Sequence, residues 1–229
     1  MKHAVYSGSR NLYPEMAAAA KSLAANSDVD RIYLLIEDPE FPSDLPSYVE
    51  AIDVSGQGWF PDGGPNMNSE FTYLALIRAA LCHLFPDIDR ILSLDVDAFC
   101  VGDVSDVWDI PLDGFYLAAS PEPVCCGKGL MYCNTGVALY NLDMLRDGKA
   151  DEVIEVLNRQ HFPNIEQDVF SYLCTGRIRY MPPEYNATAY TERTASPRVV
   201  HYAGIKHAEW KNREIVRKWR DAEWPVRSS

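Results

Sequence analysis

Residues 90–97 read RILSLDVD, and this stretch decides how the surrounding chain is interpreted. The first five positions are mostly apolar, which is the pattern of a buried strand, and Asp95 and Asp97 follow directly. Side chains two positions apart on a strand point to the same face, so we expect both carboxylates on one side. Open α/β sheets bind their ligands at the carboxyl ends of the strands. The stretch therefore predicts a strand that ends in an acidic ligand site.

Two carboxylates this close repel each other unless a cation lies between them or one is protonated, and hard divalent cations prefer such oxygen ligands. A metal site is one interpretation of the pair, and a solvated acidic turn is the other. A phosphatase with an aspartyl nucleophile would need a small hydroxyl residue at position 99, where the chain has Phe99. An EF-hand is excluded because its glycine and its bidentate glutamate are missing. A metal-dependent phosphohydrolase is therefore a minor alternative.

The sequence on both sides alternates short apolar runs with longer amphipathic stretches, which is typical of an α/β fold with a largely parallel sheet. We expect helices at 13–25, 69–85, 143–160 and 165–174, a helical turn at 104–108, and a basic helix at the C-terminus. Pro14 lies in the first turn of one helix, and Ser69 is the expected N-cap of the next. Strands are expected at 3–6, 31–36, 48–54, 90–94, 114–119, 132–140, 178–181 and 198–201.

The length of 229 residues fits a single catalytic domain, which we assign to residues 1–229. The chain has 21 Lys and Arg against 33 Asp and Glu, and its net charge of -12 argues against a nucleic-acid partner. No run approaches the roughly 18 apolar residues that span a bilayer, and residues 1–8 are too short and polar for a signal peptide. We therefore expect a soluble, cytoplasmic protein.

Six cysteines without a Cys-x-x-Cys pair predict reduced thiols rather than a disulfide framework. Cys125, Cys126 and Cys133 form a cluster that is a weaker candidate for a soft metal, because zinc sites usually contain tighter pairs. Packed or loop thiols are the favoured interpretation.

Residues 94–108, LDVDAFCVGDVSDVW, resemble a segment of the family 8 glycosyltransferases, retaining enzymes of the GT-A fold that include bacterial lipooligosaccharide galactosyltransferases and glycogenin. Three further segments resemble this family in the same order. CNTGV at 133–137, with Asn141 and Leu142, resembles its F-N-[SA]-G-V…N-L segment. EQD at 166–168 resembles its D-Q-D, and HYAG at 201–204, with Lys206, resembles its H-Y-x-G-x-x-K. Four ordered matches are far more specific than an acidic pair alone.

The resemblance implies a GT-A nucleotide-diphospho-sugar transferase fold, with one Rossmann-like, mixed but mostly parallel sheet flanked by helices. It also implies a metal-dependent retaining hexosyltransferase that moves galactose or glucose from a UDP-sugar to a hydroxyl of a glycan or glycolipid. A non-catalytic module of the same fold that binds nucleotide sugars is the alternative.

The resemblance implies that Asp95, Asp97 and His201 bind a divalent cation that bridges the two phosphates of the donor. An oxygen-rich site with one imidazole suits Mn2+, with Mg2+ as the alternative. The cation would offset the diphosphate charge in an acidic protein and stabilise the UDP leaving group. Lys206 is implied as a further phosphate contact, although the family more often carries this lysine one position later.

Gln167 is the implied catalytic residue, placed near the anomeric carbon. Because glutamine is a poor nucleophile, we favour departure from the front face, with Gln167 as electrostatic support and the leaving phosphate as base. Arg78 and Asn134 are implied contacts of the donor sugar. Glu166 stands where the family usually has Asp, so the extra methylene affects which hexose fits. The remaining residues assigned to the donor site within the matching motifs are Val96, Thr135 and Gly204.

The segment after the first strand, SGSRNLY at 7–13, lacks the acid with which the family usually recognises the base. Tyr13 is the candidate for stacking on the base, with ordinary helix packing as the alternative. Ser7 and Ser9 are candidate contacts of the uracil. Uridine specificity is therefore implied by the resemblance alone.

Residues 201–229 form a tail with seven Lys and Arg against four Asp and Glu, and with three tryptophans. A basic, aromatic helix lies readily on an anionic surface, so weak peripheral contact with the inner face of a membrane is one interpretation. A helix packed against the catalytic domain is the favoured one. Acceptor recognition is assigned to the loops at 56–66, 121–130 and 182–197.

Overall fold

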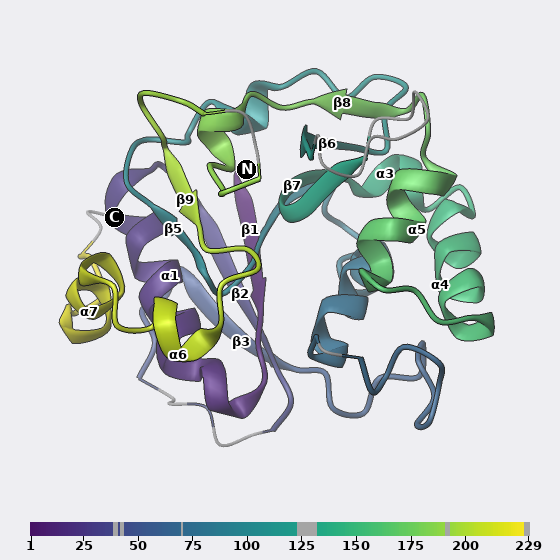
Figure 1. The fold of residues 1–229 in the computed structure, drawn as a ribbon, viewed down its shortest axis with the longest axis horizontal. Helices are drawn as coiled ribbons and strands as arrows, with labels where there is room; N and C mark the ends of the chain where they lie inside the picture. The colour runs from purple at the N-terminus through teal and green to yellow at the C-terminus, as the bar shows by residue number, and fades with distance from the viewer. Residues whose placement is uncertain (39–40, 42–43, 70, 123–131, 191–192, 227–229) are drawn as a thin grey trace.

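A seven-stranded sheet lies at the centre of the computed structural model, which describes residues 1–38, 41, 44–69, 71–122, 132–190 and 193–226 (Figure 1). Its strands are β1 (His3–Ser7), β2 (Arg31–Ile36), β3 (Val49–Asp53), β4 (Arg90–Leu94), β6 (Leu117–Pro121), β7 (Cys133–Asn141) and β8 (Ile178–Tyr180). They are ordered β3-β2-β1-β4-β7-β6-β8. Four of the six neighbouring pairs are parallel, and β7 runs antiparallel to both β4 and β6. The expected mixed, mostly parallel sheet is confirmed.

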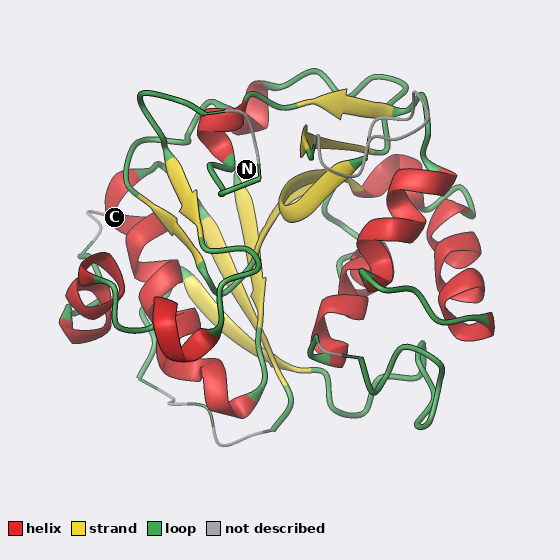
Figure 2. Cartoon of the chain, viewed as in Figure 1, coloured by secondary structure: helices red, strands yellow, loops and turns green. Residues whose placement is uncertain are grey.

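Helices cover both faces of this sheet, as Figure 2 shows. Successive residues of a strand face opposite ways, so Ala4 and Tyr6 of β1 belong to one core and Val5 belongs to the other. The first core lies under α1 (Tyr13–Asn26), α6 (His207–Trp210) and α7 (Glu214–Asp221). The second lies under η2 (Tyr73–Ala80), α2 (Leu81–Leu84), α3 (Leu142–Leu145), α4 (Lys149–Arg159) and α5 (Ile165–Leu173). The described residues also contain three short 3-10 turns: η1 (Arg10–Leu12), η3 (Val107–Asp109) and η5 (Pro183–Tyr185).

The helix expected at 69–85 begins later and is wound differently. Its N-cap is Thr72, whose hydroxyl accepts from the backbone N–H of Leu74, and not Ser69. The Ser69 hydroxyl instead makes a local turn with the backbone of Phe71. The first eight helical residues form a 3-10 helix, and only α2 has the α-helical pattern.

The helix expected at 143–160 is two helices, α3 and α4. Gly148 between them adopts a φ of 93°, in the left-handed region that glycine enters without steric cost. The strand expected at 114–119 also begins later, at Leu117, because Gly114 has a φ of 79° in the turn before it. Each difference arises at one glycine with a positive φ, Gly148 in the first case and Gly114 in the second.

A separate ribbon of two antiparallel strands, β5 (Ala98–Cys100) and β9 (Val199–His201), lies beside the main sheet. Strand β5 was not expected, since three residues are too few to show a periodic pattern. Its register places Ala98 opposite His201, and the N–H of Tyr202 donates to the carbonyl of Asp97 at 3.1 Å. The ribbon therefore brings His201 to the acidic pair that precedes β5.

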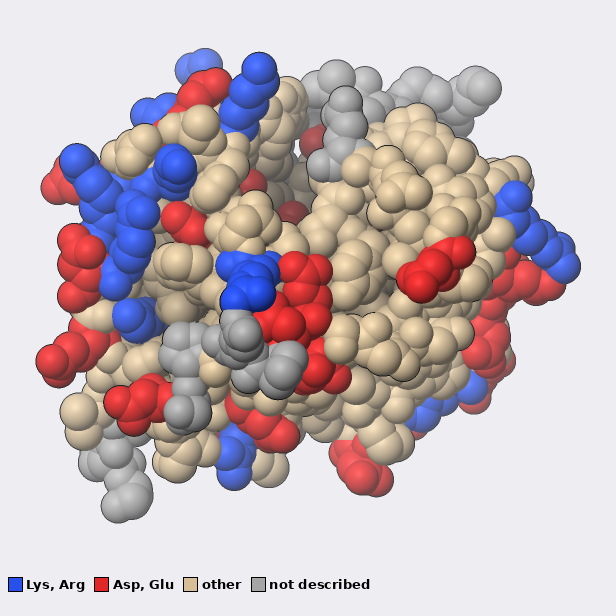
Figure 3. Space-filling view, turned by 90° about the horizontal axis from the view of Figure 1, so that it is seen from below, with Lys and Arg blue, Asp and Glu red and all other residues tan. Residues whose placement is uncertain are grey.

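The C-terminal tail is held against α1. Val216 of α7 is fully buried, and the Lys21 ammonium of α1 donates to the carbonyl of Ala222 at 2.6 Å. Trp210 of α6 packs against Phe99 in the ribbon, with ring centroids 6.4 Å apart. Seen from below, Lys and Arg side chains gather at the left of the molecule, on the side where Figure 1 places α7 (Figure 3). Cationic side chains are therefore numerous on the side of the molecule where α7 packs.

Within the described ranges, no helix is both long and apolar enough to cross a membrane. The free thiols of the described cysteines are buried: Cys82, Cys100, Cys133 and Cys174. Cys125 and Cys126 of the candidate soft-metal cluster lie outside the described residues, as does most of the loop expected at 121–130.

Candidate active site

Asp95, Asp97 and His201 come together where β4 ends. The backbone N–H of Asp95 donates to the carbonyl of Gly136 on β7 at 2.7 Å, which fixes the start of the turn. His201 Nε2 lies 3.5 Å from Asp95 Oδ2 and 3.2 Å from Asp97 Oδ1. One ligand atom from each residue lies within 4.8 Å of the other two. Two carboxylate oxygens and one imidazole nitrogen are a donor set that suits a divalent cation such as Mn2+.

The charges around this cluster strongly shift the pKa values of Asp95 and His201. Burial favours the neutral form of Asp95, but Arg78 and His201 outweigh it and lower the Asp95 pKa to about 2. Burial also favours neutral His201, but the two carboxylates outweigh it and raise the His201 pKa to about 10. Without a bound cation, the imidazole of His201 is therefore protonated, and its positive charge faces the two carboxylates. A metal ion would take the place of the proton on the imidazole, so its binding would release a proton to solvent.

Gly136 leaves the space that this cluster fills. A Cβ at this position would lie 2.2 Å from His201 Cε1 and 2.6 Å from Asp95 Oδ2, far inside contact distance. Its φ is not positive, so the backbone conformation alone does not require glycine. The glycine of the CNTGV segment is therefore explained by the close approach of the histidine and the carboxylate.

Arg78 connects the acidic pair to α5. Its side chain is only 7% exposed, and its Nη2 lies 3.0 Å from Asp95 Oδ1 while its Nε lies 3.2 Å from Glu166 Oε1. A third nitrogen, Nη1, donates to the carbonyl of Thr135 at 2.8 Å. The fixed fork of a guanidinium allows these contacts at once, which a lysine could not reproduce. The expected donor-site arginine is thus part of the cluster.

Glu166 is 1% exposed and lies beside Arg78. Burial raises the pKa of its carboxyl to about 7, although Arg78 opposes this shift. Its Oε1 accepts from the hydroxyl of Thr135 at 3.1 Å, while Oε2 has no hydrogen-bond partner among the described residues. The preceding Ile165 has a φ of 39°, an unusual conformation for a β-branched residue. Strained backbone of this kind often marks functional sites.

Gln167 is locked in place by hydrogen bonds at both ends of its amide. Its Oε1 accepts from the N–H of Thr135 at 3.1 Å, and its Nε2 donates to Glu122 at 3.0 Å and to the Tyr132 hydroxyl at 3.1 Å. The predicted catalytic side chain projects from α5, is half-buried, and is held by Thr135 against β7, the strand that carries Gly136. Glu122 belongs to the loop at 121–130 that was assigned to acceptor recognition, whereas Tyr132 was not predicted.

Asn134 and His201 are joined by Asn186, which lies in the loop at 182–197 that was assigned to acceptor recognition and was not predicted to contact the metal or donor residues. Asn186 is completely buried; its Nδ2 donates to Asn134 Oδ1 at 2.9 Å, and its Oδ1 lies 2.8 Å from His201 Nδ1. These partners are 52 and 15 positions away in the chain. No local pattern could have marked the residue, because its role depends on contacts that only the fold creates.

The turn after β1 lies next to the acidic pair. Tyr6 of β1 is opposite Leu94 of β4, so Ser7 is level with Asp95. A Cβ at Gly8 would lie 3.0 Å from a methyl of Val96, which is partly buried against the first core. The structure therefore brings Ser7 and Val96 to the same edge of the sheet as the metal ligands.

Tyr13, the first residue of α1, is buried against the residues that follow β2. Its hydroxyl donates to Asp38 at 3.2 Å and accepts from the N–H of Glu37 at 3.0 Å, and its ring meets Phe41 edge-on. Glu37 in turn accepts from the N–H of Arg10 at 2.7 Å. The turn at 7–13 contains no acid in its own sequence, but Glu37 and Asp38 lie beside it. Both residues directly follow the neighbouring strand β2.

Gly204 and Lys206 follow the ribbon. Gly204 has a φ of 72°, and a Cβ there would lie 2.5 Å from the Tyr190 hydroxyl, so both conformation and space favour glycine. Lys206 is exposed and immediately precedes α6. The structure thus places Lys206 at the surface, five residues beyond His201, the buried end of the ribbon.

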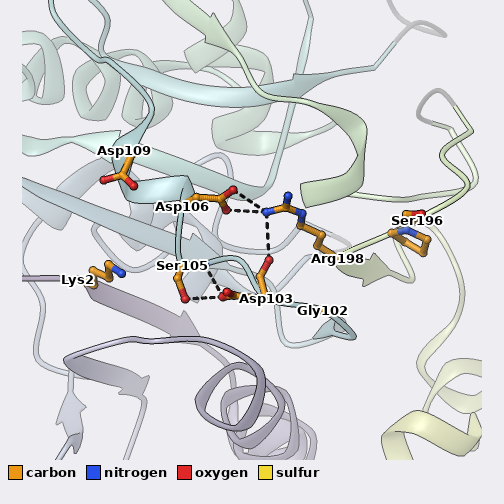
Figure 4. A pocket seen from close by; sticks show the side chains of 9 residues that line it. Lys2, Gly102, Asp103, Ser105, Asp106, Asp109, Ser196 and Arg198 are labelled. Carbon is orange, nitrogen blue, oxygen red and sulfur yellow. Dashed lines mark hydrogen bonds and ion pairs between the residues drawn. The ribbon is translucent and has the colours of Figure 1, made fainter.

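A cavity of about 630 Å³ lies at the other end of the ribbon (Figure 4). Arg198, which precedes β9, pairs there with Asp106 at 2.6 Å and with the carbonyl of Asp103 at 3.2 Å. Ser196 and Pro197, from the loop expected to recognise the acceptor, line it, but none of the residues predicted for the metal or the donor does. The register of β5 and β9 separates the two places, because Ala98 faces His201 whereas Cys100 faces Val199.

Comparison with known proteins identifies the family. The model of "Glycosyl transferase family 8" matches residues 64–212, which include the acidic pair, Asn134, Gln167 and His201. The chain belongs to glycosyl transferase family 8. The expected family is thereby confirmed.

Three relatives illustrate this membership. The chain is 26% identical over 196 residues to glycosyltransferase GlyE of Streptococcus pneumoniae serotype 4, covering 80% of this chain and 47% of the relative. It is 28% identical over 151 residues to a lipopolysaccharide 1,2-glucosyltransferase of Escherichia coli K12, covering 51% and 43%. The chain thus spans less than half the length of these relatives. The crystal structure of galactosyltransferase LgtC with donor and acceptor sugar analogues is similar in fold, with a TM-score of 0.77, 20% identity, and coverage of 98% of this chain and 97% of that one. The GT-A-like fold is confirmed by this similarity.

Proposed function

We propose that this family 8 protein is a retaining, metal-dependent hexosyltransferase that moves galactose or glucose from a UDP-sugar to a hydroxyl of a glycan or glycolipid. The observation that carries the proposal is the direct link through Arg78 between Asp95 of the metal cluster and Glu166 beside the catalytic candidate Gln167. The family model and the names of two relatives, a glucosyltransferase and a galactosyltransferase, support a hexose.

Asp95, Asp97 and His201 would hold the cation, with Mn2+ preferred and Mg2+ as the alternative. The donor set fits, and the absence of a side chain at Gly136 leaves the imidazole and a carboxylate room to meet. When bound, the ion would supply the positive charge that offsets the diphosphate and the departing UDP. In a chain of net charge -12, this compensation is needed before a nucleotide sugar can bind tightly.

The chain's own residues position the donor around this site. Arg78 and Asn134 would donate to hydroxyls of the sugar, with Thr135 and Glu166 behind them. Gln167 would lie on the reactive face, where its fixed amide stabilises charge that develops as the glycosidic bond breaks. Because an amide is a poor nucleophile, the acceptor hydroxyl would lose its proton to the departing phosphate.

The nucleotide would lie along the carboxyl ends of β1 and β4. Ser7, Tyr13 and Val96 are the proposed contacts of the uridine, and Gly204 and Lys206 those of the phosphates. Glu37 and Asp38, beside Tyr13, are candidates for the acid that the turn after β1 lacks. Their proximity supports selection of a base with N–H groups.

Thermal unfolding tests the proposed function. We expect the melting temperature to rise by several degrees when UDP and Mn2+ are added together and by less with either alone, since a ligand that binds only the folded state stabilises it. Mg2+ should replace Mn2+ with a smaller effect. No rise with saturating UDP and Mn2+ would refute the nucleotide site.

A second assay separates the enzyme from a non-catalytic binding module. Release of UDP from UDP-galactose or UDP-glucose in the presence of glycan acceptors is expected for the enzyme. Binding of UDP with no release from any donor and acceptor would favour the module instead.

The basic tail is a secondary proposal for contact with an anionic membrane surface. The exposed cations Arg217 and Lys218 of α7 support it. Co-sedimentation with vesicles of phosphatidylglycerol, but not of phosphatidylcholine, is the expected outcome, and it should weaken as salt is added.

A further inference from the structure

We propose that Asn186 is a positioning residue that fixes two groups of the active site at once. It holds a hydrogen of His201 on Nδ1, so that Nε2, which faces Asp95 and Asp97, is the nitrogen available to a cation. It also holds the amide oxygen of Asn134 away from the donor sugar. This inference rests on the proposed function and adds a residue that the metal and sugar ligands themselves do not reveal.

The backbone N–H of Gly136 fixes the orientation of the Asn134 amide. It donates to Asn134 at 3.0 Å, and a backbone N–H is always a donor. The atom of Asn134 that faces it must therefore be the amide oxygen, which settles the orientation of this side chain. The amide nitrogen of Asn134 is then on the opposite side.

The same oxygen fixes Asn186. An atom of the Asn186 amide lies 2.9 Å from Asn134 Oδ1, and only a donor can make this contact, so it is the nitrogen Nδ2. The oxygen of Asn186 is consequently the atom that lies 2.8 Å from His201 Nδ1. An amide oxygen only accepts, so Nδ1 must donate and must carry a hydrogen.

The other ring nitrogen, Nε2, would lose its hydrogen when a cation binds. Because Asn186 holds a hydrogen on Nδ1, removal of one proton from the imidazolium would leave the lone pair on Nε2. Nε2 is the atom that faces the carboxylates of Asp95 and Asp97 at 3.5 and 3.2 Å. The tautomer in which the metal-facing nitrogen can bind a cation is thus selected by a series of hydrogen bonds that runs from Gly136 through Asn134 and Asn186 to His201.

Burial makes these hydrogen bonds hard to replace with bonds to water. Asn186 is 0% and His201 4% exposed, so water cannot easily satisfy either group if the contact is lost. Residues that hydrogen-bond to the far nitrogen of a ligand histidine usually change metal affinity or activity by about 10–100-fold when they are replaced. We expect a loss in this range for Asn186→Leu, which keeps a similar volume and removes the hydrogen bonds to Asn134 and His201.

The matched control is Asn66→Leu. Asn66 is also buried, and it makes three backbone hydrogen bonds, to Leu157, Gln160 and Phe162, in a different part of the fold. Its replacement should destabilise the protein without altering the affinity for Mn2+. Comparison of the two variants separates loss of positioning from loss of stability.

The second variant, Asn186→Asp, divides the two functions of the residue. A carboxylate still accepts from His201 Nδ1, so this variant should bind Mn2+ at least as tightly as the unsubstituted protein. It cannot donate to Asn134, and two oxygens would then face each other at a distance of 2.9 Å. The rate of transfer from the UDP-sugar should therefore fall by about tenfold or more although the metal is bound.

The experiment measures Mn2+ binding by electron paramagnetic resonance of the free ion, with transfer rates and melting temperatures recorded on the same samples. The proposal is supported if Mn2+ affinity falls at least tenfold in Asn186→Leu, stays unchanged in Asn66→Leu and is retained in Asn186→Asp. Wild-type affinity in a folded Asn186→Leu variant overturns it. If that variant does not fold, a tenfold loss of affinity in Asn186→Asp overturns it instead. Failure of the unsubstituted protein to bind Mn2+ overturns the proposed metal-dependent function and this inference with it.

Discussion

Gly136→Ala is the most informative small change that the structure offers, because one added methyl group meets two proposed metal ligands. The new Cβ would lie 2.2 Å from His201 Cε1, 2.9 Å from His201 Nε2 and 2.6 Å from Asp95 Oδ2. Ordinary contacts of a Cβ begin near 3.4 Å. The imidazole would therefore have to retreat by about 1 Å, a shift that exceeds what packed side chains absorb without cost.

Two opposing effects determine the result on stability. Alanine in place of glycine within a strand usually stabilises by about 0.5–1 kcal/mol. Overpacking of a buried site usually destabilises by about 1–3 kcal/mol. Since His201 is tied to Asn186 and has little room to move, we expect the second effect to dominate, with a net loss of about 1–2 kcal/mol. Displacement of the ring should also weaken Mn2+ binding by about 10–100-fold.

Urea unfolding and electron paramagnetic resonance of Mn2+ measure the two effects. The control is Gly102→Ala, where the new Cβ would meet its nearest neighbour, Arg198 Cα, at an ordinary 3.5 Å. That variant should bind Mn2+ normally. If Gly136→Ala binds Mn2+ with wild-type affinity, the reasoning that places this glycine beneath the metal ligands is refuted.

Three further predictions concern buried groups. Arg78→Met should lower the free energy of unfolding by about 3–5 kcal/mol, because it leaves the buried carboxyl of Glu166 beside Asp95 without its cation. Adding Glu166→Gln to this variant should restore part of the lost stability, as measured by urea unfolding. If the effects of the two substitutions are purely additive, the coupling between Arg78 and Glu166 is contradicted. The Glu166 pKa is raised from 4.5 to about 7 in the folded protein, so the folded state retains a proton that the unfolded state releases. The stability of the wild type relative to Glu166→Gln should thus fall by about 3 kcal/mol as the pH rises from 4.5 to 7 and then level off, and parallel pH profiles of the two proteins would disprove this. Trp210→Ala should cost about 3–5 kcal/mol, since its ring packs against Phe99 and Tyr202, and a melting temperature within a degree of wild type would contradict this packing.

The order of strands and helices could be predicted from the sequence wherever a segment was long enough to show a period. Strands β1, β2 and β4 are such segments. Strand β5 has three residues, and its identity depends on the partner that pairs with it, β9. The break between α3 and α4 depends on whether Gly148 continues a helix or adopts a positive φ, and both are open to glycine.

The residues of the site were predictable to different degrees for a physical reason. Asp95 and Asp97 lie together because they are close in sequence, so a local pattern finds them. His201 and Arg78 could be placed only through the resemblance to a family, because long-range contacts bring them to the acids. Asn186, Glu37 and Asp38 had neither a local pattern nor a family motif, and the fold alone brings them to the site.

The ribbon of β5 and β9 has a consequence for how the chain opens. Asp97 and His201 are separated by about 100 residues, so an ion bound to both would act as a reversible cross-link that closes most of the second half of the chain into one loop. Three residue pairs alone are a weak ribbon. Amide hydrogens of β9 should therefore exchange with solvent through local opening in the absence of metal, and only through global unfolding once the ion is bound.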